Sequence, residues 1–253
     1  MLGKRIVVDT SKCIGCKACQ IACQQWHGLE AEDTTFTGSY QNPPDFSGVT
    51  MTLAKFIEKE GADGKVKWLF LKDQCRHCET PNCKPSCPLG AIKRKGSGAV
   101  FIKAELCNPT ACTSQPYPAL RPCQAGCPFK VSGDGLGIPR WKYEKDGVLI
   151  GDKMTKCDFC YNRFAHPDLL AAPFVSTDGL TKSAKPACQV TCPPGAIVSG
   201  TADTQLNKAN KRVTYLKAHG YPNANVYPNQ TGMKTHVIWI LTDAPSAYGL
   251  PIV

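Results

Sequence analysis

One stretch decides the fold of this chain: Cys13-Ile14-Gly15-Cys16-Lys17-Ala18-Cys19-Gln20-Ile21-Ala22-Cys23. Its cysteines follow the spacing Cys-x2-Cys-x2-Cys-x3-Cys, in which the first three thiolates come from one tight loop and can reach three corners of an iron–sulfur cube. The fourth cysteine is carried by the helix that we expect to follow, and it points away toward a neighbouring cube. The spacing therefore predicts [4Fe–4S] clusters that are built in pairs.

The other cysteines of the chain form three related groups. All sixteen cysteines fall into four groups of four, and the later three groups end in Cys-x3-Cys-Pro, as in bacterial ferredoxins. Group two is Cys75, Cys78, Cys83 and Cys87; group three is Cys107, Cys112, Cys123 and Cys127; group four is Cys157, Cys160, Cys188 and Cys192. Four groups predict four [4Fe–4S] clusters as the cofactors.

Two other uses of so many cysteines fit the sequence less well. A disulfide framework is typical of small secreted domains, and residues 1–9 show no apolar leader core. Structural zinc sites use two separated Cys-x2-Cys pairs. In the run Cys-x2-Cys-x2-Cys-x3-Cys, the third and fourth cysteines would then have no role. A zinc-binding interaction module is thus a remote alternative.

The basic charge of the chain has an internal explanation. The formal net charge is +10, which alone would favour nucleic acid as a partner. Four clusters with their thiolates contribute about −8 and leave roughly +2. We therefore expect no nucleic-acid partner, and no apolar run is long enough to span a membrane.

The residues around the cysteines predict an α+β fold that is rich in loops. Apolar residues stand five positions before three groups: Val8, Phe70 and Ile102. Each unit is interpreted as a short strand, a cluster-binding loop, a short helix and a return strand, which is the ferredoxin-like unit. Beyond the cysteines, we predict a helix from Thr201 to about residue 219 and a strand over 236–241. The residues alone leave the pairing of groups open, either between neighbours or nested.

Several segments resemble the iron–sulfur β subunits of molybdenum- or tungsten-dependent formate dehydrogenases. The resemblance covers almost the whole chain and rests on residues 13–20, Trp26-His27-Gly28, Gln41-Asn42-Pro43-Pro44-Asp45-Phe46, Trp68-Leu69-Phe70, residues 73–78, 186–197 and 236–239, and Tyr248-Gly249-Leu250-Pro251. The cysteine groups are shared with many molybdopterin oxidoreductases, whereas residues 41–46 and the tail point to formate dehydrogenase.

The resemblance implies two nested modules with two clusters each. The outer module comprises residues 1–70 plus 141–200, the inserted module residues 71–140, and residues 201–253 are a C-terminal extension expected to pack on the partner subunit. The implied ligands are, for cluster 1, Cys13, Cys16, Cys19 and Cys192; for cluster 2, Cys75, Cys78, Cys83 and Cys127; for cluster 3, Cys107, Cys112, Cys123 and Cys87; for cluster 4, Cys157, Cys160, Cys188 and Cys23.

Two departures from the family pattern bear on this assignment. The family's group three resembles Cys-x2-Cys-x2-Cys-x3-Cys-Pro, whereas here the first two gaps are x4 and x10. Because all four cysteines remain, we expect the cluster to be kept. Membrane-bound relatives carry a C-terminal transmembrane helix, and this chain ends at Val253, so the resemblance implies a soluble heterodimer.

The implied function is electron transfer without catalysis in this chain. The partner would be a catalytic α subunit with a Mo or W pterin, and the acceptor an external carrier such as a c-type cytochrome. The resemblance also implies the periplasm, reached by co-export with that subunit; the cytoplasm is the alternative. We expect neither a catalytic residue nor a histidine ligand, although His27, His77 and His166 lie near cysteines. Cations adjacent to ligands are candidates for tuning potentials: Lys12, Lys17, Arg76, Lys84, Lys156 and Arg163.

Two other interpretations of the function remain open. The chain could be the β subunit of another molybdopterin oxidoreductase, such as a nitrate, thiosulfate, polysulfide or sulfoxide reductase. It could also be a free-standing multi-cluster ferredoxin, although the long loops and the tail favour a chain with a partner.

Overall fold

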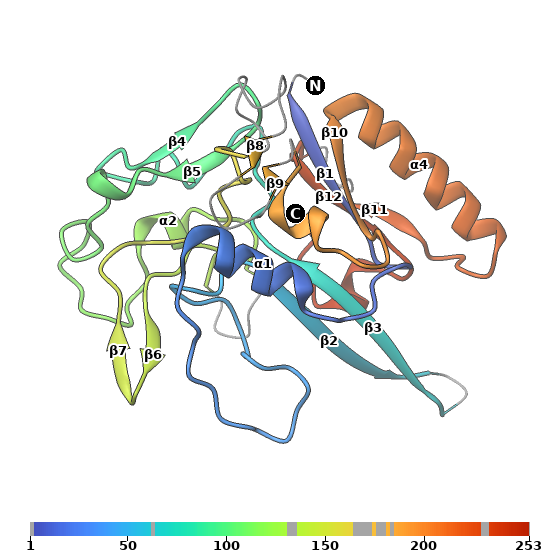
Figure 1. Ribbon diagram of the computed structural model, residues 1–253, viewed down its shortest axis with the longest axis horizontal. Helices are drawn as coiled ribbons and strands as arrows, with labels where there is room; N and C mark the ends of the chain where they lie inside the picture. Colours follow the sequence, from blue (N-terminus) through green and yellow to red (C-terminus); the bar gives the residue numbers. More distant parts are fainter. Residues whose placement is uncertain are drawn as a thin grey trace.

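The central element of the fold is a mixed four-stranded sheet in the order β10-β1-β12-β11 (Figure 1). The computed structural model describes residues 3–61, 64–130, 136–163, 174–175, 181–182, 185–228 and 233–252. Strand β1 (Lys4–Asp9) pairs antiparallel with β10 (Ile197–Thr201) and parallel with β12 (Val237–Leu241). Strand β12 also pairs antiparallel with β11 (Asn225–Tyr227). The two ends of the chain therefore meet in one sheet.

Alternation along the strands gives this sheet two apolar faces. On one face, Val7, Ile238 and Ile240 pack with Ala209 and Leu216 of α4 (Ala202–Ala218). On the other face, Ile6, Val8, Val237, Trp239 and Leu241 join the largest core cluster, which also contains cysteines. Successive strand residues point to opposite faces, so one β1 sequence serves both layers. The sheet separates α4 from the region that holds the cysteines.

Four two-stranded hairpins and three shorter helices complete the described fold. The hairpins are β2 (Leu53–Glu60) with β3 (Val66–Asp73), β4 (Ile92–Arg94) with β5 (Val100–Ile102), β6 (Tyr143–Lys145) with β7 (Val148–Ile150), and β8 (Phe174–Val175) with β9 (Thr181–Lys182). The helices are α1 (Ala18–His27), α2 (Pro122–Ala125) and α3 (Ala187–Val190), with 3-10 turns at Ala104–Leu106 and Pro245–Tyr248. In Figure 1 the β2–β3 hairpin extends away from the sheet on the side opposite β4 and β5.

Most of the predicted elements are confirmed. Strands β1, β3 and β5 precede groups one, two and three, and β10 and β4 follow groups four and two. Helix α4 begins after Thr201 and ends before Gly220, whose φ of 91° lies in the left-handed region that favours glycine. The predicted tail strand is β12, which lies in the same sheet as β1.

The short helix predicted for each ferredoxin-like unit is missing in group two, where the residues after Cys83 form turns. Pro85 and Pro88 flank Cys87 there, and proline lacks the N–H that a helix interior requires. The helix of group three is likewise short, four residues that begin at Pro122. Within the described residues, no helix combines the length and the apolar character that a bilayer crossing needs.

Candidate iron–sulfur sites

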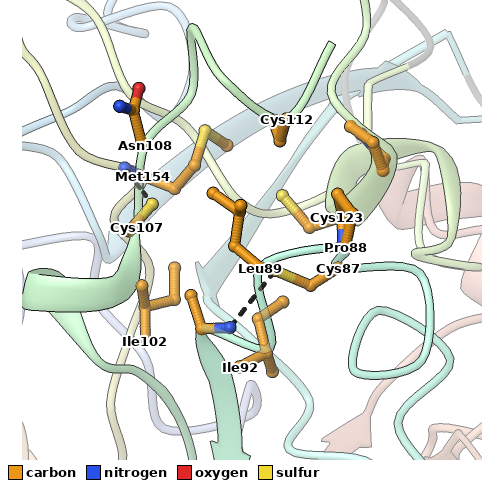
Figure 2. A pocket seen from close by; sticks show the side chains of 12 residues that line it. Cys87, Pro88, Leu89, Ile92, Ile102, Cys107, Asn108, Cys112, Cys123 and Met154 are labelled. Atoms are coloured by element: carbon orange, nitrogen blue, oxygen red, sulfur yellow. Dashed lines mark hydrogen bonds between the residues drawn. The ribbon is translucent and has the colours of Figure 1, made fainter.

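Three cavities are each lined by four cysteines. The cavity at site 3 is lined by Cys87, Cys107, Cys112 and Cys123 (Figure 2). Site 1 is lined by Cys13, Cys16, Cys19 and Cys192, and site 2 by Cys75, Cys78, Cys83 and Cys127. Within the described residues, no group of three or more His, Cys, Asp or Glu side chains is placed to hold a single metal ion. Four thiols around each cavity therefore fit an iron–sulfur cube better than one metal ion.

The remaining four cysteines gather in the interior as site 4. Cys23, Cys157, Cys160 and Cys188 are all buried. Burial raises the pKa of Cys160 well above its usual value, and repulsion by Cys188, Asp158, Cys23 and Cys157 adds to the rise. Of the four sites, site 4 is the one whose four members are all buried.

Burial and mutual repulsion oppose ionisation of the thiols in these sites. Burial raises the pKa of Cys19, Cys83 and Cys123 to about 12 in each case. At sites 2 and 3, nearby thiols such as Cys75 and Cys107 add to this effect. A metal ligand must be a thiolate, so a positively charged iron core would supply the compensation that such packed thiols lack. The donor set therefore fits [4Fe–4S] clusters.

The loops that carry the cysteines adopt unusual backbone conformations. Of the five non-glycine residues with positive φ in the described chain, four lie in these loops: Lys17, His77, Phe159 and Cys160. Gly15 has φ of 67°, and a Cβ there would come 2.8 Å from the Phe70 ring. Such conformations cost about 1–3 kcal/mol each for non-glycine residues and gather at functional sites. The loops are shaped to wrap a cluster.

Group three reaches its site despite its irregular spacing. The Asn108 side chain accepts hydrogen bonds from the backbone N–H groups of Thr110 and Ala111, both at 3.1 Å, and so closes a turn between Cys107 and Cys112. Backbone N–H groups of Ala91 and Met154 donate to the sulfurs of Cys87 and Cys107, each at 3.3 Å (Figure 2). Apart from Asn108 and Pro122, the residues between the cysteines of group three do not line the cavity.

Two of the predicted tuning cations are buried against sites 2 and 4. Lys156 donates to the carbonyl oxygens of Val100 and Cys157, the latter at 3.0 Å. Burial alone would lower the pKa of Lys156, but Cys75, Cys83 and Cys157 raise it above its usual value. Arg76 lines site 2, pairs with Asp73 and lies 4.7 Å from the Trp239 ring centroid. Both cations keep their charge beside cysteines.

The other predicted cations differ in their surroundings. Lys17 lines site 1 but donates to the carbonyl oxygen of Asn42 at 2.8 Å. Arg163 is buried over the Trp26 ring, at 4.6 Å from its centroid. Lys12 and Lys84 are exposed. Proximity in sequence therefore does not bring every one of these cations to a sulfur.

Two histidines contact site 4. His77 Nδ1 accepts the backbone N–H of Val100 at 3.0 Å, so Nε2 carries the proton and donates to the Cys157 sulfur at 3.4 Å. Burial holds the pKa of His77 well below its usual value. His27 Nε2 lies 3.1 Å from Asp158 and its Nδ1 lies 2.9 Å from the Cys23 carbonyl oxygen. His166 lies outside the described residues.

Sequence reasoning missed Lys72, which the fold places between sites 1 and 4. Lys72 is fully buried at the end of β3 and lines site 1. Burial alone would lower its pKa, but Cys188, Cys157, Cys19 and Cys23 raise it above the usual value. A lysine directly after the apolar run Trp68-Leu69-Phe70-Leu71 was the available signal, although it is not adjacent to a cysteine.

Interactions between thiols also show which sites are neighbours. Cys19 of site 1 interacts with Cys188 of site 4, and Cys157 of site 4 with Cys75 of site 2. Cys123 of site 3 interacts with Cys83 of site 2. Among the described thiols whose pKa is shifted, these interactions connect the sites in one series.

Comparison with known families agrees with this chemistry. Two family models, each described as a 4Fe-4S dicluster domain, match residues 12–91 and 66–172. These matches and the sixteen cysteines in four groups define a ferredoxin-type electron-transfer protein with four [4Fe–4S] clusters.

Comparison with individual proteins narrows the class to one family. The iron–sulfur subunit of the nitrate-inducible formate dehydrogenase of Escherichia coli is 38% identical over 97% of this chain and 71% of its own length. The formate dehydrogenase β subunit of Megalodesulfovibrio gigas is 34% identical, over 86% of this chain and 85% of its own. The β subunit of formate dehydrogenase 2 (cytochrome c-553) of Nitratidesulfovibrio vulgaris is 31% identical, over 97% and 96%. The chain belongs to the iron–sulfur subunits of formate dehydrogenases.

Proposed function

We propose that this chain relays electrons through its sites in the order 1, 4, 2, 3. The thiol interactions between sites 1 and 4, 4 and 2, and 2 and 3 support this order. The ligand sets of the proposal are those that line sites 1 to 3 and gather at site 4. Each bound cluster supplies reversible one-electron transfer.

The same proposal includes the nested arrangement of modules, with residues 71–140 inserted into an outer module. Two strand pairings support it: β1 before group one pairs with β10 after group four, and β4 after group two pairs with β5 before group three. Cys192 at site 1 and Cys127 at site 2 come from groups four and three, which is the exchange that nesting requires.

Sites 1 and 3 are the two ends of the proposed relay. Cys16 of site 1 is exposed, and Ile14, which lines the same site, is 58% exposed. At site 3, Leu89 lines the cavity and is 36% exposed. Apolar side chains beside a surface sulfur would exclude water when a partner docks, so each end suits a redox partner.

The proposed partners follow from the family. A formate dehydrogenase catalytic subunit with a Mo or W pterin would exchange electrons at one end, and this chain would contribute no catalytic residue. A c-type cytochrome would serve the other end; the name of the N. vulgaris relative includes cytochrome c-553. We also propose the periplasm as the location, reached with the catalytic subunit.

The experiment uses the anaerobically purified complex of both subunits. Formate should bleach the visible absorption of the clusters and then reduce a cytochrome. Cys16→Ser should disable site 1 and Cys112→Ser should disable site 3, which are the opposite ends of the relay. In one of these variants formate should no longer reduce the remaining sites. In the second variant formate should still reduce the remaining sites, and only the reduction of cytochrome should be lost. A metal-replete complex that formate does not reduce would refute the proposal.

A further inference from the structure

Lys72 is held firmly at the boundary between sites 1 and 4. Its backbone pairs with Ala54 of β2, and its carbonyl oxygen accepts the indole N–H of Trp239 at 2.8 Å. Ala54 also lines site 1. The position of Lys72 is thus fixed by two strands, β2 and β3, and by the central sheet.

The ammonium group of Lys72 has sulfur as its surroundings. The residue is 1% exposed, and no oxygen or nitrogen of the described chain forms a hydrogen bond with Nζ. Its strongest attractive interactions are with Cys188, Cys157, Cys19 and Cys23. The carboxylate next in sequence, Asp73, is bound by Lys55 at 3.0 Å and by Arg76. The ammonium therefore faces one cysteine of site 1 and three of site 4.

A buried cation needs compensation from nearby negative charge. Clusters with four thiolates are anionic, and each reduction adds one further negative charge. A cation beside such a site stabilises its reduced form more than its oxidised form, which raises the reduction potential. A cation shared by two sites acts on both.

We propose that Lys72 sets the reduction potentials of sites 1 and 4 together, by stabilising the reduced form of each through its buried positive charge. This inference rests on the proposed ligand sets of those sites. It makes Lys72 a residue that adjusts the relay at one junction, without contact with the substrate of the complex. Sites 2 and 3 lie outside its strongest interactions.

The test is a potentiometric titration of the complex by electron paramagnetic resonance, with Lys72→Met as the variant. Two of the four clusters should become harder to reduce by about tenfold in the equilibrium constant, which is about 59 mV for one electron. The other two potentials should stay unchanged. Lys84→Met is the matched control, because Lys84 follows a ligand in sequence yet is exposed, and it should move no potential.

Iron content separates the possible failures. If the wild type lacks clusters, the proposed function fails. This inference alone fails if Lys72→Met keeps its full iron content and changes none, or only one, of the reduction potentials. It also fails if Lys84→Met lowers the reduction potentials as much as Lys72→Met does. Should Lys72→Met lose iron, Lys72→Arg keeps the charge and should assemble with wild-type potentials. Loss of iron or lowered potentials in Lys72→Arg would overturn the inference.

Discussion

Sites 4 and 3 are made from the two least regular cysteine groups, yet their surroundings are opposite. Site 4 is entirely interior and has Lys72 of β3 and the loop residues Lys156 and His77 beside it. Site 3 is lined largely by apolar side chains, including Leu89, Ile92, Ile102 and Met154 (Figure 2). Of these, Leu89 is exposed at the surface. Group four thus contributes to a polar interior site, whereas group three contributes to an apolar site that is partly exposed.

This contrast shows how one ligand type can serve two positions in a relay. Cluster potentials depend on hydrogen bonds to sulfur, nearby charge and solvent access. Site 4 is governed by side-chain donors and cations, so single substitutions should move its potential. Site 3 receives backbone N–H groups from Ala91 and Met154, which substitutions leave in place. Changes at site 3 should instead affect how firmly the cluster is held.

The largest expected effect comes from removing a ligand at each site. Cys188→Ala should lose about four irons and divide the relay, because site 4 lies inside the proposed order. Cys112→Ala should lose a similar amount of iron but leave sites 1, 4 and 2 contiguous. Electron transfer from formate to the acceptor should fall on the order of a hundredfold in Cys188→Ala, near the upper range for changes around metal sites.

The informative difference lies in how many of the remaining clusters equilibrate with each other. Electron paramagnetic resonance after brief reduction should find three connected clusters in Cys112→Ala and an isolated one in Cys188→Ala. Three connected clusters in Cys188→Ala would contradict the interior position of site 4.

A smaller effect is expected when the turn of group three is removed. Asn108→Ala deletes the acceptor for Thr110 and Ala111 and should weaken site 3 by about 1 kcal/mol. The rate of iron release to a chelator should then rise about fivefold for one cluster in four. Thr110→Val, which removes the Thr110 hydroxyl but keeps its backbone N–H, is the control, and it should change the rate less than Asn108→Ala does.

The smallest of the effects concerns a single hydrogen bond at site 4. His77→Leu removes the donor to Cys157 and should make that cluster harder to reduce by about threefold, or about 30 mV. His77→Gln, which can keep a donor near the sulfur, should restore part of the shift. Equal shifts in both variants would indicate a packing effect, since His77 also lies against the Phe159 ring.

The sequence predicted the local features well because their causes are local. Cysteine spacing and the residues five positions earlier identified β1, β3 and β5, and the cap and apolar period identified α4. The missing helix of group two was also foreseeable, since Pro85 and Pro88 stand in the printed sequence. Such features depend on neighbours within a few residues.

The sequence alone did not reveal what depends on distant strands. Lys72 reaches its sulfurs because β3 pairs with β2 and packs under Trp239 of the tail. His77 is directed at Cys157 because Val100, on β5, fixes its ring. No periodicity indicates that β12 runs parallel to β1 at the centre of the sheet. The ligand sets and module boundaries remain predictions that the variants above would test.

The most direct test of the account is the iron and acid-labile sulfide content of the anaerobically purified complex. After subtraction of any iron bound by the catalytic subunit, this chain should contain about sixteen iron atoms and as many sulfides, which is four per cube. A chain with about four zinc ions and little sulfide would contradict the account, because nothing in it could then carry an electron.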